Sequence, residues 1–180
     1  MRINRGKLKS RRFSVPKAFP SRPTTDFAKE GLFNVLENRI SFHDLKILDL
    51  CAGTGNISLE FASREAGKIT AVDKNFNCVR FIDSLTKELG VNEDIQVVKS
   101  DVVQYLKQTN TVYDIIFADP PYAEKFHLDI VNTVFERNLL SAFGWLIIEH
   151  GREVDLSSHP NFVDMKKYSN VHFSFLKLKS

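Results

Sequence analysis

Apolar and polar positions divide this chain into short hydrophobic runs and longer segments with a helical repeat. Five apolar runs, each with an acidic residue at or close to its end, lie at residues 45–50, 68–72, 95–98, 113–118 and 145–149. Runs of this length that are rich in β-branched and aromatic residues are typical of buried strands in a parallel sheet. The pattern therefore predicts five parallel strands.

Segments in which apolar residues recur at helical spacing separate the five runs. They predict helices over residues 24–39, 56–66, 76–89, 102–108 and 128–137. Because strands alternate with helices, the fold class is α/β, with helices on both faces of the sheet. Residues 162–178 alternate with period two in their second arm and predict an antiparallel hairpin, which brings the sheet to seven strands. Residues 7–15 alternate loosely between basic and apolar and predict a short strand or hairpin.

Charge is distributed unevenly along the 180 residues, which carry a net charge of +3. The first 22 residues hold eight basic side chains and no acidic one, which leaves 17 basic against 22 acidic residues in the rest. The eight are Arg2, Arg5, Lys7, Lys9, Arg11, Arg12, Lys17 and Arg22. A basic extension on an acidic body predicts binding to a phosphate backbone, although a solubilising tail has the same composition.

Composition places the chain among ordinary globular proteins of one domain. No apolar run approaches the roughly 20 residues of a membrane span. Residues 1–5 include the charged Arg2 and Arg5, and the apolar stretch of a secretory signal does not follow them. Cys51 and Cys78 fit neither a disulfide framework nor a metal-ligand spacing. We therefore expect a cytoplasmic protein that uses no metal and no membrane.

A glycine turn, Gly53-Thr54-Gly55, follows the first predicted strand and leads directly into a helix. Glycines at such a turn let the backbone adopt positive φ and approach a ligand closely. The dinucleotide fingerprint fits poorly, because its third glycine position is Ser58 and because Asp49 would repel a pyrophosphate. Asp49 instead suits a ligand with a positive charge. Asp73, twenty positions after Gly53, stands where such folds bind ribose hydroxyls.

The fourth predicted strand ends at Asp119-Pro120-Pro121-Tyr122. The two prolines stop the strand because neither has an N–H for the ladder. The turn offers a carboxylate, main-chain carbonyls and an aromatic ring, a set that suits the amine and the face of a nucleobase. A plain strand end with an exposed tyrosine is the structural alternative. Asp101 also has two explanations, as the N-cap of the helix 102–108 or as a carboxylate that reaches a ligand amine.

Carboxyl ends of parallel strands meet at one edge of a sheet, and ligands bind there. The expected edge gathers Asp49, Asp73, Asp101, Asp119 and the final residue of the fifth strand, Glu149. Such a group of carboxylates is costly unless a ligand that is cationic or rich in N–H groups occupies the crevice. No histidine or cysteine is among them, and their spacing is not that of a compact metal site. S-adenosylmethionine fits better, since it carries a sulfonium, an α-amine, a ribose diol and an adenine amine.

Together, the glycine turn, the acids after the second and third strands and the Asp-Pro-Pro-Tyr turn resemble the class I S-adenosylmethionine-dependent methyltransferases that act on exocyclic amino nitrogens. More closely, the chain is similar to the RsmD-type small-subunit rRNA guanine-N2 methyltransferases. Residues 6–13, 22–26 and 30–34 carry this likeness, and residues 48–55 and 148–150 match as well. The resemblance covers nearly the whole chain.

What the resemblance implies for the fold is a Rossmann-like, mostly parallel sheet with a C-terminal antiparallel hairpin. It also implies a basic N-terminal hairpin or arm over residues 1–23 and a methyltransferase domain over residues 24–180. The methyl donor is S-adenosylmethionine. Residues expected to bind it are Asp49, Ala52, Gly53, Gly55, Asp73, Lys74, Asp101, Val102 and Asp119.

The resemblance also assigns roles toward the methyl acceptor. Asp119 and the Pro120 carbonyl accept hydrogen bonds from a guanine amine, and Tyr122 stacks on the flipped base. The expected partner is 16S rRNA, free or in an assembling small subunit, bound by a monomer. Residues expected to bind the RNA are Arg5, Lys7, Arg11, Arg12, Arg22 and Thr24.

Two other functions stay open on the sequence. The same turn would serve an adenine-N6 or a glutamine-amide methyltransferase. The second alternative is a ribosome-assembly protein that keeps the fold and binds RNA without catalysis. The intact Asp49, Asp73 and Asp119 favour an enzyme.

Overall fold

The computed structural model describes residues 1–16, 19–20, 24–121 and 124–179. Within them, seven strands form one sheet in the order β3-β2-β1-β4-β5-β7-β6. The strands are β1 (Lys46–Leu50), β2 (Lys68–Asp73), β3 (Ile95–Lys99), β4 (Tyr113–Ala118), β5 (Leu140–His150), β6 (Phe162–Tyr168) and β7 (Val171–Leu176). The helices are α1 (Asp26–Glu37), α2 (Asn56–Ser63), α3 (Phe76–Glu88), α4 (Val102–Gln108) and α5 (Glu124–Glu136). The first five strands are parallel and β7 is antiparallel to its neighbours, as predicted.

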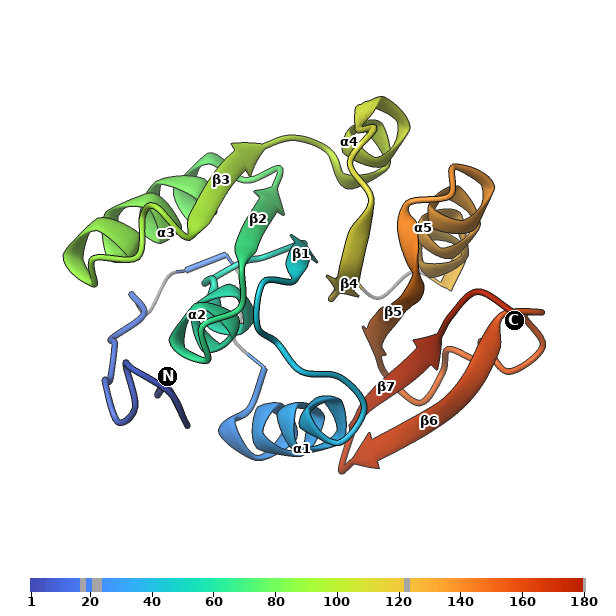
Figure 1. Ribbon diagram of the computed structural model, residues 1–180, viewed down its shortest axis with the longest axis horizontal. Coiled ribbons are helices and arrows are strands. Elements are labelled where there is room, and N and C mark those ends of the chain that lie inside the picture. Colours follow the sequence, from blue (N-terminus) through green and yellow to red (C-terminus); the bar gives the residue numbers. More distant parts are fainter. Residues whose placement is uncertain (17–18, 21–23, 122–123, 180) are drawn as a thin grey trace.

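Helices cover both faces of the sheet (Figure 1). Helices α1, α2 and α3 contribute to a core on one face that includes Ile47 of β1 and Ile115 of β4. Helices α4 and α5 contribute to the other core, with Leu48 of β1 and Ile116 of β4. Successive residues of a strand serve opposite cores because side chains alternate along it. This double burial explains why the central strands read as unbroken apolar runs.

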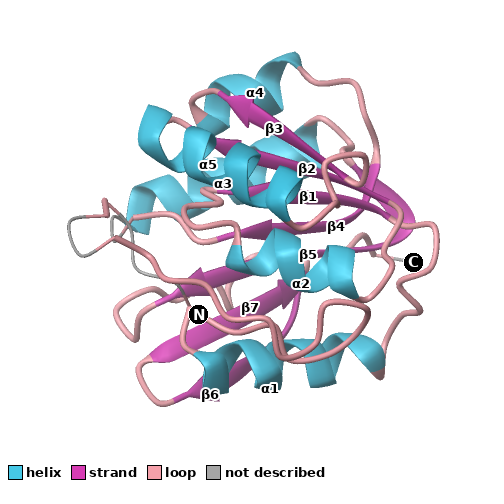
Figure 2. Ribbon diagram, turned by 90° about the vertical axis from the view of Figure 1, so that its left-hand side faces the viewer, coloured by secondary structure: helices cyan, strands magenta, loops and turns pink. Residues whose placement is uncertain are grey.

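The central strands end at one level, at the edge that carries the candidate chemistry (Figure 2). Leu50 at the end of β1 aligns with Val72 of β2 and with Ala118 of β4. From β1 the chain proceeds outward to β3 and then returns to β4, so the connections after β1 and β4 leave in opposite directions. A crevice at the carboxyl ends of these strands follows from that reversal.

The largest differences from the predicted boundaries are at the starts of α5 and β5. Helix α5 begins at Glu124 and not near residue 128, and β5 begins at Leu140 and not at residue 145. The pairing of β4 with β5 is irregular, since it shifts from Tyr113–Leu140 to Ile115–Trp145. Phe143 in the intervening segment is 87% exposed. The apolar run therefore marked only the buried half of β5.

Residues 1–13 form a hairpin that packs onto α2. Arg2 and Arg12 form an antiparallel bridge, and Ile3 is 1% exposed within the first core. At Gly6, with φ +85°, a Cβ atom would stand 1.8 Å from the Ser63 carbonyl oxygen, so only glycine fits. The predicted hairpin is thus confirmed in kind but lies earlier than residues 7–15. No helix in the described part of the chain is long and apolar enough to span a membrane.

Candidate active site

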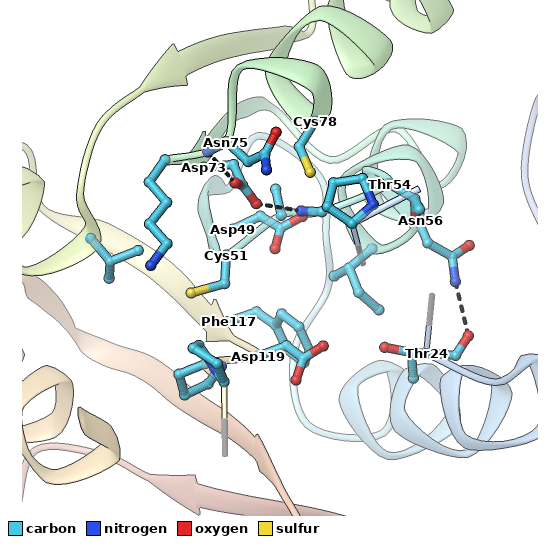
Figure 3. A pocket seen from close by; sticks show the side chains of 18 of the residues that line it. Thr24, Asp49, Cys51, Thr54, Asn56, Asp73, Asn75, Cys78, Phe117 and Asp119 are labelled. Atoms are coloured by element: carbon cyan, nitrogen blue, oxygen red, sulfur yellow. Dashed lines mark hydrogen bonds between the residues drawn. The ribbon is translucent and has the colours of Figure 1, made fainter. Parts of the chain in front are cut away.

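A cavity of about 510 Å³ lies at the carboxyl ends of the central strands (Figure 3). Most of the residues predicted to bind the donor or the acceptor line it, namely Asp49, Ala52, Gly53, Asp73, Lys74, Asp101, Val102, Asp119 and Pro120. Figure 3 shows Asp73 and Asn75 on one side of the cavity and Asp119 and Thr24 on the other. The structure therefore brings the predicted site together. Tyr122 lies outside the described residues.

Gly55 is the one predicted donor-binding residue that does not line this cavity. It is the N-cap of α2, with φ +72°, and a Cβ atom there would stand 3.0 Å from the Ile82 side chain. Positive φ and this close contact explain the glycine. Its conformation shapes the turn, and its role as a direct ligand contact stays a prediction.

Asp73 holds the glycine turn from the end of β2. Its Oδ2 accepts the Gly53 N–H at 2.9 Å, and its Oδ1 accepts the Asn75 N–H at 2.8 Å. Each carboxylate oxygen has a further lone pair for another donor. Asp73 is therefore both a support for the loops after β1 and β2 and an available acceptor on the cavity wall.

Asp49 is 1% exposed and lies beneath the start of α2. Its Oδ2 accepts the Ser58 N–H at 3.0 Å and the Ser58 hydroxyl at 2.5 Å. Burial raises the pKa of Asp49 to about 7, although the Ser58 bonds oppose the shift. Ser58, which stands where a third fingerprint glycine would be, thus has its own function as the partner of Asp49.

Asp119 and Glu149 lie next to each other on neighbouring strands. Ala118 of β4 aligns with Ile148 of β5. Asp119 and Glu149, the next residue of each segment, are therefore neighbours at the following position. Burial raises the pKa of Asp119 to about 7. Burial raises the pKa of Glu149 to about 8, and the charge of Asp119 adds to this shift. Among the described residues neither carboxylate forms an ion pair.

Asp101 caps helix α4 and also lies on the cavity wall. Its Oδ1 accepts the Gln104 N–H at 3.0 Å, which caps helix α4, and the residue also lines the cavity next to Val102. A cap that accepts one N–H keeps lone pairs for a ligand amine. The two explanations of Asp101 are therefore compatible.

The residues predicted to bind RNA do not lie together. Arg5 pairs with Glu37 and Lys7 pairs with Asp94, each at 2.9 Å. Glu37 ends α1 and Asp94 immediately precedes β3, so both pairs lie at the opposite end of the sheet from Asp119. Both side chains are thus engaged in ion pairs away from the cavity, and their contact with the rRNA backbone stays a prediction.

The other predicted RNA contacts differ among themselves. Arg11 and Arg12 are exposed on the N-terminal hairpin, and Arg22 lies outside the described residues. Thr24 is 8% exposed and lines the cavity, where its hydroxyl donates to Glu149 at 2.8 Å. Thr25, and not Thr24, caps α1. Thr24 is therefore a cavity residue and not an open site for a phosphate.

Sequence patterns missed a set of buried polar residues behind Thr24. Asn56 lines the cavity and donates from Nδ2 to the Thr24 carbonyl at 3.1 Å. Lys29 donates from Nζ to Asn56 Oδ1 at 2.8 Å, and its side chain is fully buried. The separations along the chain, 32 and 27 residues, leave no local signal that would reveal these contacts.

Comparison with known proteins places this site in a family. The chain matches the model of the family "Conserved hypothetical protein 95" over residues 1–177. The chain belongs to this family. It is 34% identical over 152 residues to the Ribosomal RNA small subunit methyltransferase D of Escherichia coli (strain K12), covering 83% of this chain and 71% of that protein. Against the protein of the same name from Buchnera aphidicola subsp. Baizongia pistaciae the identity is 28% over 178 residues, covering 97% and 90%.

A solved structure shares the whole fold of this chain. The structure of yhhF from Escherichia coli has a TM-score of 0.85 against this chain at 26% identity, covering 99% of both. The resemblance to the RsmD-type methyltransferases and the Rossmann-like fold are thereby confirmed. A Release factor glutamine methyltransferase from Borreliella burgdorferi is 30% identical over 124 residues, or 68% of this chain, but only 41% of that protein is covered.

Proposed function

We propose that this protein transfers a methyl group from S-adenosylmethionine to the exocyclic N2 of a guanine in 16S rRNA. The observation that carries the proposal is the Asp119-Pro120 turn, which shares one cavity with the glycine turn and Asp73. The family's curated relatives that are named Ribosomal RNA small subunit methyltransferase D support the choice of substrate.

The chemistry of the cavity fits the methyl donor. Asp49 and Asp119 are buried carboxylates whose pKa values are raised by burial, and no cationic side chain of the described residues pairs with them. A sulfonium and an α-amine would provide the compensating charge. Asp73 would accept the ribose hydroxyls, and Asp101 with Val102 would meet the adenine. When bound, S-adenosylmethionine supplies an electrophilic methyl group.

Asp119 and the Pro120 carbonyl would act on the acceptor. The lone pair of guanine N2 is delocalised into the ring, so this nitrogen is a weak nucleophile. Two acceptors at the cavity wall orient its N–H groups and raise its electron density, which stabilises the charge that develops on nitrogen. With a pKa of about 7, Asp119 is also matched to take the proton that N2 loses.

We infer that residues 24–180 form the methyltransferase domain and that residues 1–23 extend its RNA-binding surface. The exposed Arg11 and Arg12 are the described N-terminal residues that best suit a phosphate backbone. We also infer that the enzyme acts in the cytoplasm as a monomer, and that Tyr122 stacks on the flipped base.

Labelled methyl transfer tests this function directly. Protein, S-adenosylmethionine with a tritiated methyl group and unmodified 16S rRNA, free or in assembled particles, are incubated, and the product is digested to nucleosides. N2-methylguanosine is the expected product. N6-methyladenosine would overturn the assignment of the base. Transfer only to glutamine in a protein substrate would overturn the assignment of RNA.

A further inference from the structure

Thr24 is fixed in one orientation at the acceptor side of the cavity. Its carbonyl accepts Asn56 Nδ2 at 3.1 Å, and its hydroxyl donates to Glu149 Oε2 at 2.8 Å. The amide of Asn56 cannot flip, because Lys29 donates to its Oδ1 at 2.8 Å and an ammonium group has no acceptor. Backbone and side chain of Thr24 are thus held by two independent partners.

The contact with Glu149 determines which hydrogen-bonding role Thr24 offers to a ligand. A hydroxyl has one proton and two acceptor lone pairs. The proton is used by Glu149, and a carboxyl group keeps an acceptor oxygen whether or not it is ionised. What remains of the Thr24 hydroxyl for the cavity is therefore a hydrogen-bond acceptor.

Thr24 lies beside the residues that would hold the reacting amine. Glu149 lies near the end of β5 and occupies the register position next to Asp119, which follows β4. Both Thr24 and Asp119 line the cavity, on the side away from Asp73 (Figure 3). The acceptor side of the cavity thus combines the Asp119 carboxylate, the Pro120 carbonyl and the Thr24 hydroxyl oxygen, all of them acceptors.

Guanine and the other amine-bearing bases differ in what they present to such a wall. Guanine carries an N1–H next to its N2 amine, so the two adjacent positions N1 and N2 both present donors, with the O6 acceptor beyond them. Adenine carries a lone pair at N1 next to its amine, and a lone pair facing an acceptor is repelled. The structure assigns Thr24 as a specificity-determining residue that accepts the guanine N1–H, with Glu149 as the positioning residue that fixes its hydroxyl. This inference rests on the proposed function, because it identifies the base within that site.

2-Aminopurine provides a sharp test, because it keeps the N2 amine but has a lone pair at N1. RNA substrates are prepared with either guanosine or 2-aminopurine riboside at the nucleotide where the labelled product is mapped. The measured quantity is the ratio of kcat/KM for the two substrates, for wild type and for Thr24→Val. 2-Aminopurine also lacks O6, but that loss is common to both enzymes and cancels when their ratios are compared.

Wild type is expected to prefer guanosine by roughly 10- to 100-fold, because 2-aminopurine leaves a buried acceptor unpaired. Thr24→Val is expected to lower this preference about 10-fold or more, mainly through slower transfer to guanosine. Thr24→Ser keeps the hydroxyl and should keep the preference. Thr133→Val is the matched control, because the Thr133 hydroxyl donates to the Asp129 carbonyl within α5.

Glu149→Ala separates positioning from folding. It leaves the Thr24 hydroxyl free to turn and donate to N1 of 2-aminopurine, so the preference should fall although Thr24 is present. Equal use of both substrates by wild type, or an unchanged preference in Thr24→Val, would overturn the assignment. The product nucleoside separates a failure of the Thr24 assignment from a failure of the proposed function. If N2-methylguanosine forms but the Thr24 variants keep the wild-type preference, only the Thr24 assignment is overturned. Any other product overturns both the proposed function and the Thr24 assignment.

Discussion

Two groups of buried charged side chains in this molecule are built in opposite ways. Beneath the N-terminal hairpin, Glu60 pairs with Lys29 at 3.1 Å and with Arg64 at 2.9 Å. Its carboxylate also accepts the N–H groups of Asn4 and Arg5. We refer to Lys29, Glu60 and Arg64 as the ionic cluster. Every charge in it has a partner, which is the condition under which burial of charge is tolerated.

Among the residues that the structure describes, no cationic side chain pairs with the carboxylates at the cavity. Asp49, Asp119 and Glu149 are buried at the carboxyl ends of the strands, and we refer to them as the cavity carboxylates. Burial raises the pKa of all three carboxylates. In the ionic cluster, by contrast, the carboxylate of Glu60 is paired with cationic side chains of the protein itself. The comparison indicates that the ionic cluster holds the fold together, and we propose that a ligand completes the cavity carboxylates.

Removal of Glu60 should have the largest effect on stability. Glu60→Ala leaves Lys29 and Arg64 buried without their shared counter-ion and frees two backbone N–H groups of the hairpin. The expected loss is about 3–5 kcal/mol of unfolding free energy. Urea unfolding measures it, with Glu37→Ala as the control, since Glu37 is more exposed and should cost less. Equal losses for the two variants would contradict the central place of Glu60.

Removal of Asp119 should affect chemistry and not folding. Asp119→Ala is expected to slow methyl transfer by about 100-fold or more, because the amine loses its charged acceptor. Stability of the free protein should be unchanged or higher, since an uncompensated buried carboxylate is removed. Single-turnover transfer and thermal melting check the two halves. Asp119→Asn keeps one acceptor oxygen and should retain part of the rate.

Asp49 should reduce the stability of the free protein as pH rises. Its pKa is about 7 in the folded protein and about 3.9 when unfolded, so the folded state binds the proton more tightly. Protonated Asp49 therefore contributes to the stability of the folded protein, and this contribution is lost as pH rises through about 7. Asp49→Asn should therefore have little effect near pH 4 but stabilise the free protein by about 1–3 kcal/mol at pH 8. Melting temperatures across that pH range measure the difference.

The exposed charges of the hairpin should have the smallest effects on stability. Lys7→Ala breaks an exposed pair with Asp94 and should cost no more than about 1 kcal/mol. Arg11 and Arg12 form no ion pair among the described residues, so their joint replacement by alanine should weaken RNA binding more than Lys7→Ala does. Filter binding over a range of salt concentrations checks this, because each lost phosphate contact flattens the salt dependence. If Lys7→Ala weakened RNA binding more than the joint replacement of Arg11 and Arg12, RNA would contact the end of the sheet opposite the cavity.

Much of the fold could be predicted from the sequence because its signals are local. Apolar runs mark β1 to β5, and an acidic residue at or near the end of each run follows from the shared edge of a parallel sheet. The start of β5 was missed, because its first half is partly exposed and irregularly paired with β4. An apolar run in the sequence marks buried residues, and few residues in the first half of β5 are buried.

The candidate site was predicted only in the residues that carry motifs. The glycine turn, Asp73 and Asp119 were found in this way and share the cavity. The contact of Thr24 with Glu149 joins residues 125 positions apart, and Lys29 reaches Asn56 over 27. Such partners depend on how α1 packs beside α2 and β5, which no periodicity encodes. Basic residues likewise indicated a phosphate-binding arm but not that Arg5 and Lys7 form ion pairs.

The most direct test of the difference between the two charged groups is proton release on donor binding. Isothermal titration with S-adenosylmethionine, in buffers of different ionisation enthalpy at pH 6 to 8, reports both affinity and protons released. A cationic sulfonium favours the ionised forms of Asp49 and Asp119, so affinity should rise with pH and protons should leave the protein. S-adenosylhomocysteine, which lacks the sulfonium charge, should release fewer. Binding without proton release and without pH dependence would contradict the claim that the cavity carboxylates are completed by the methyl donor.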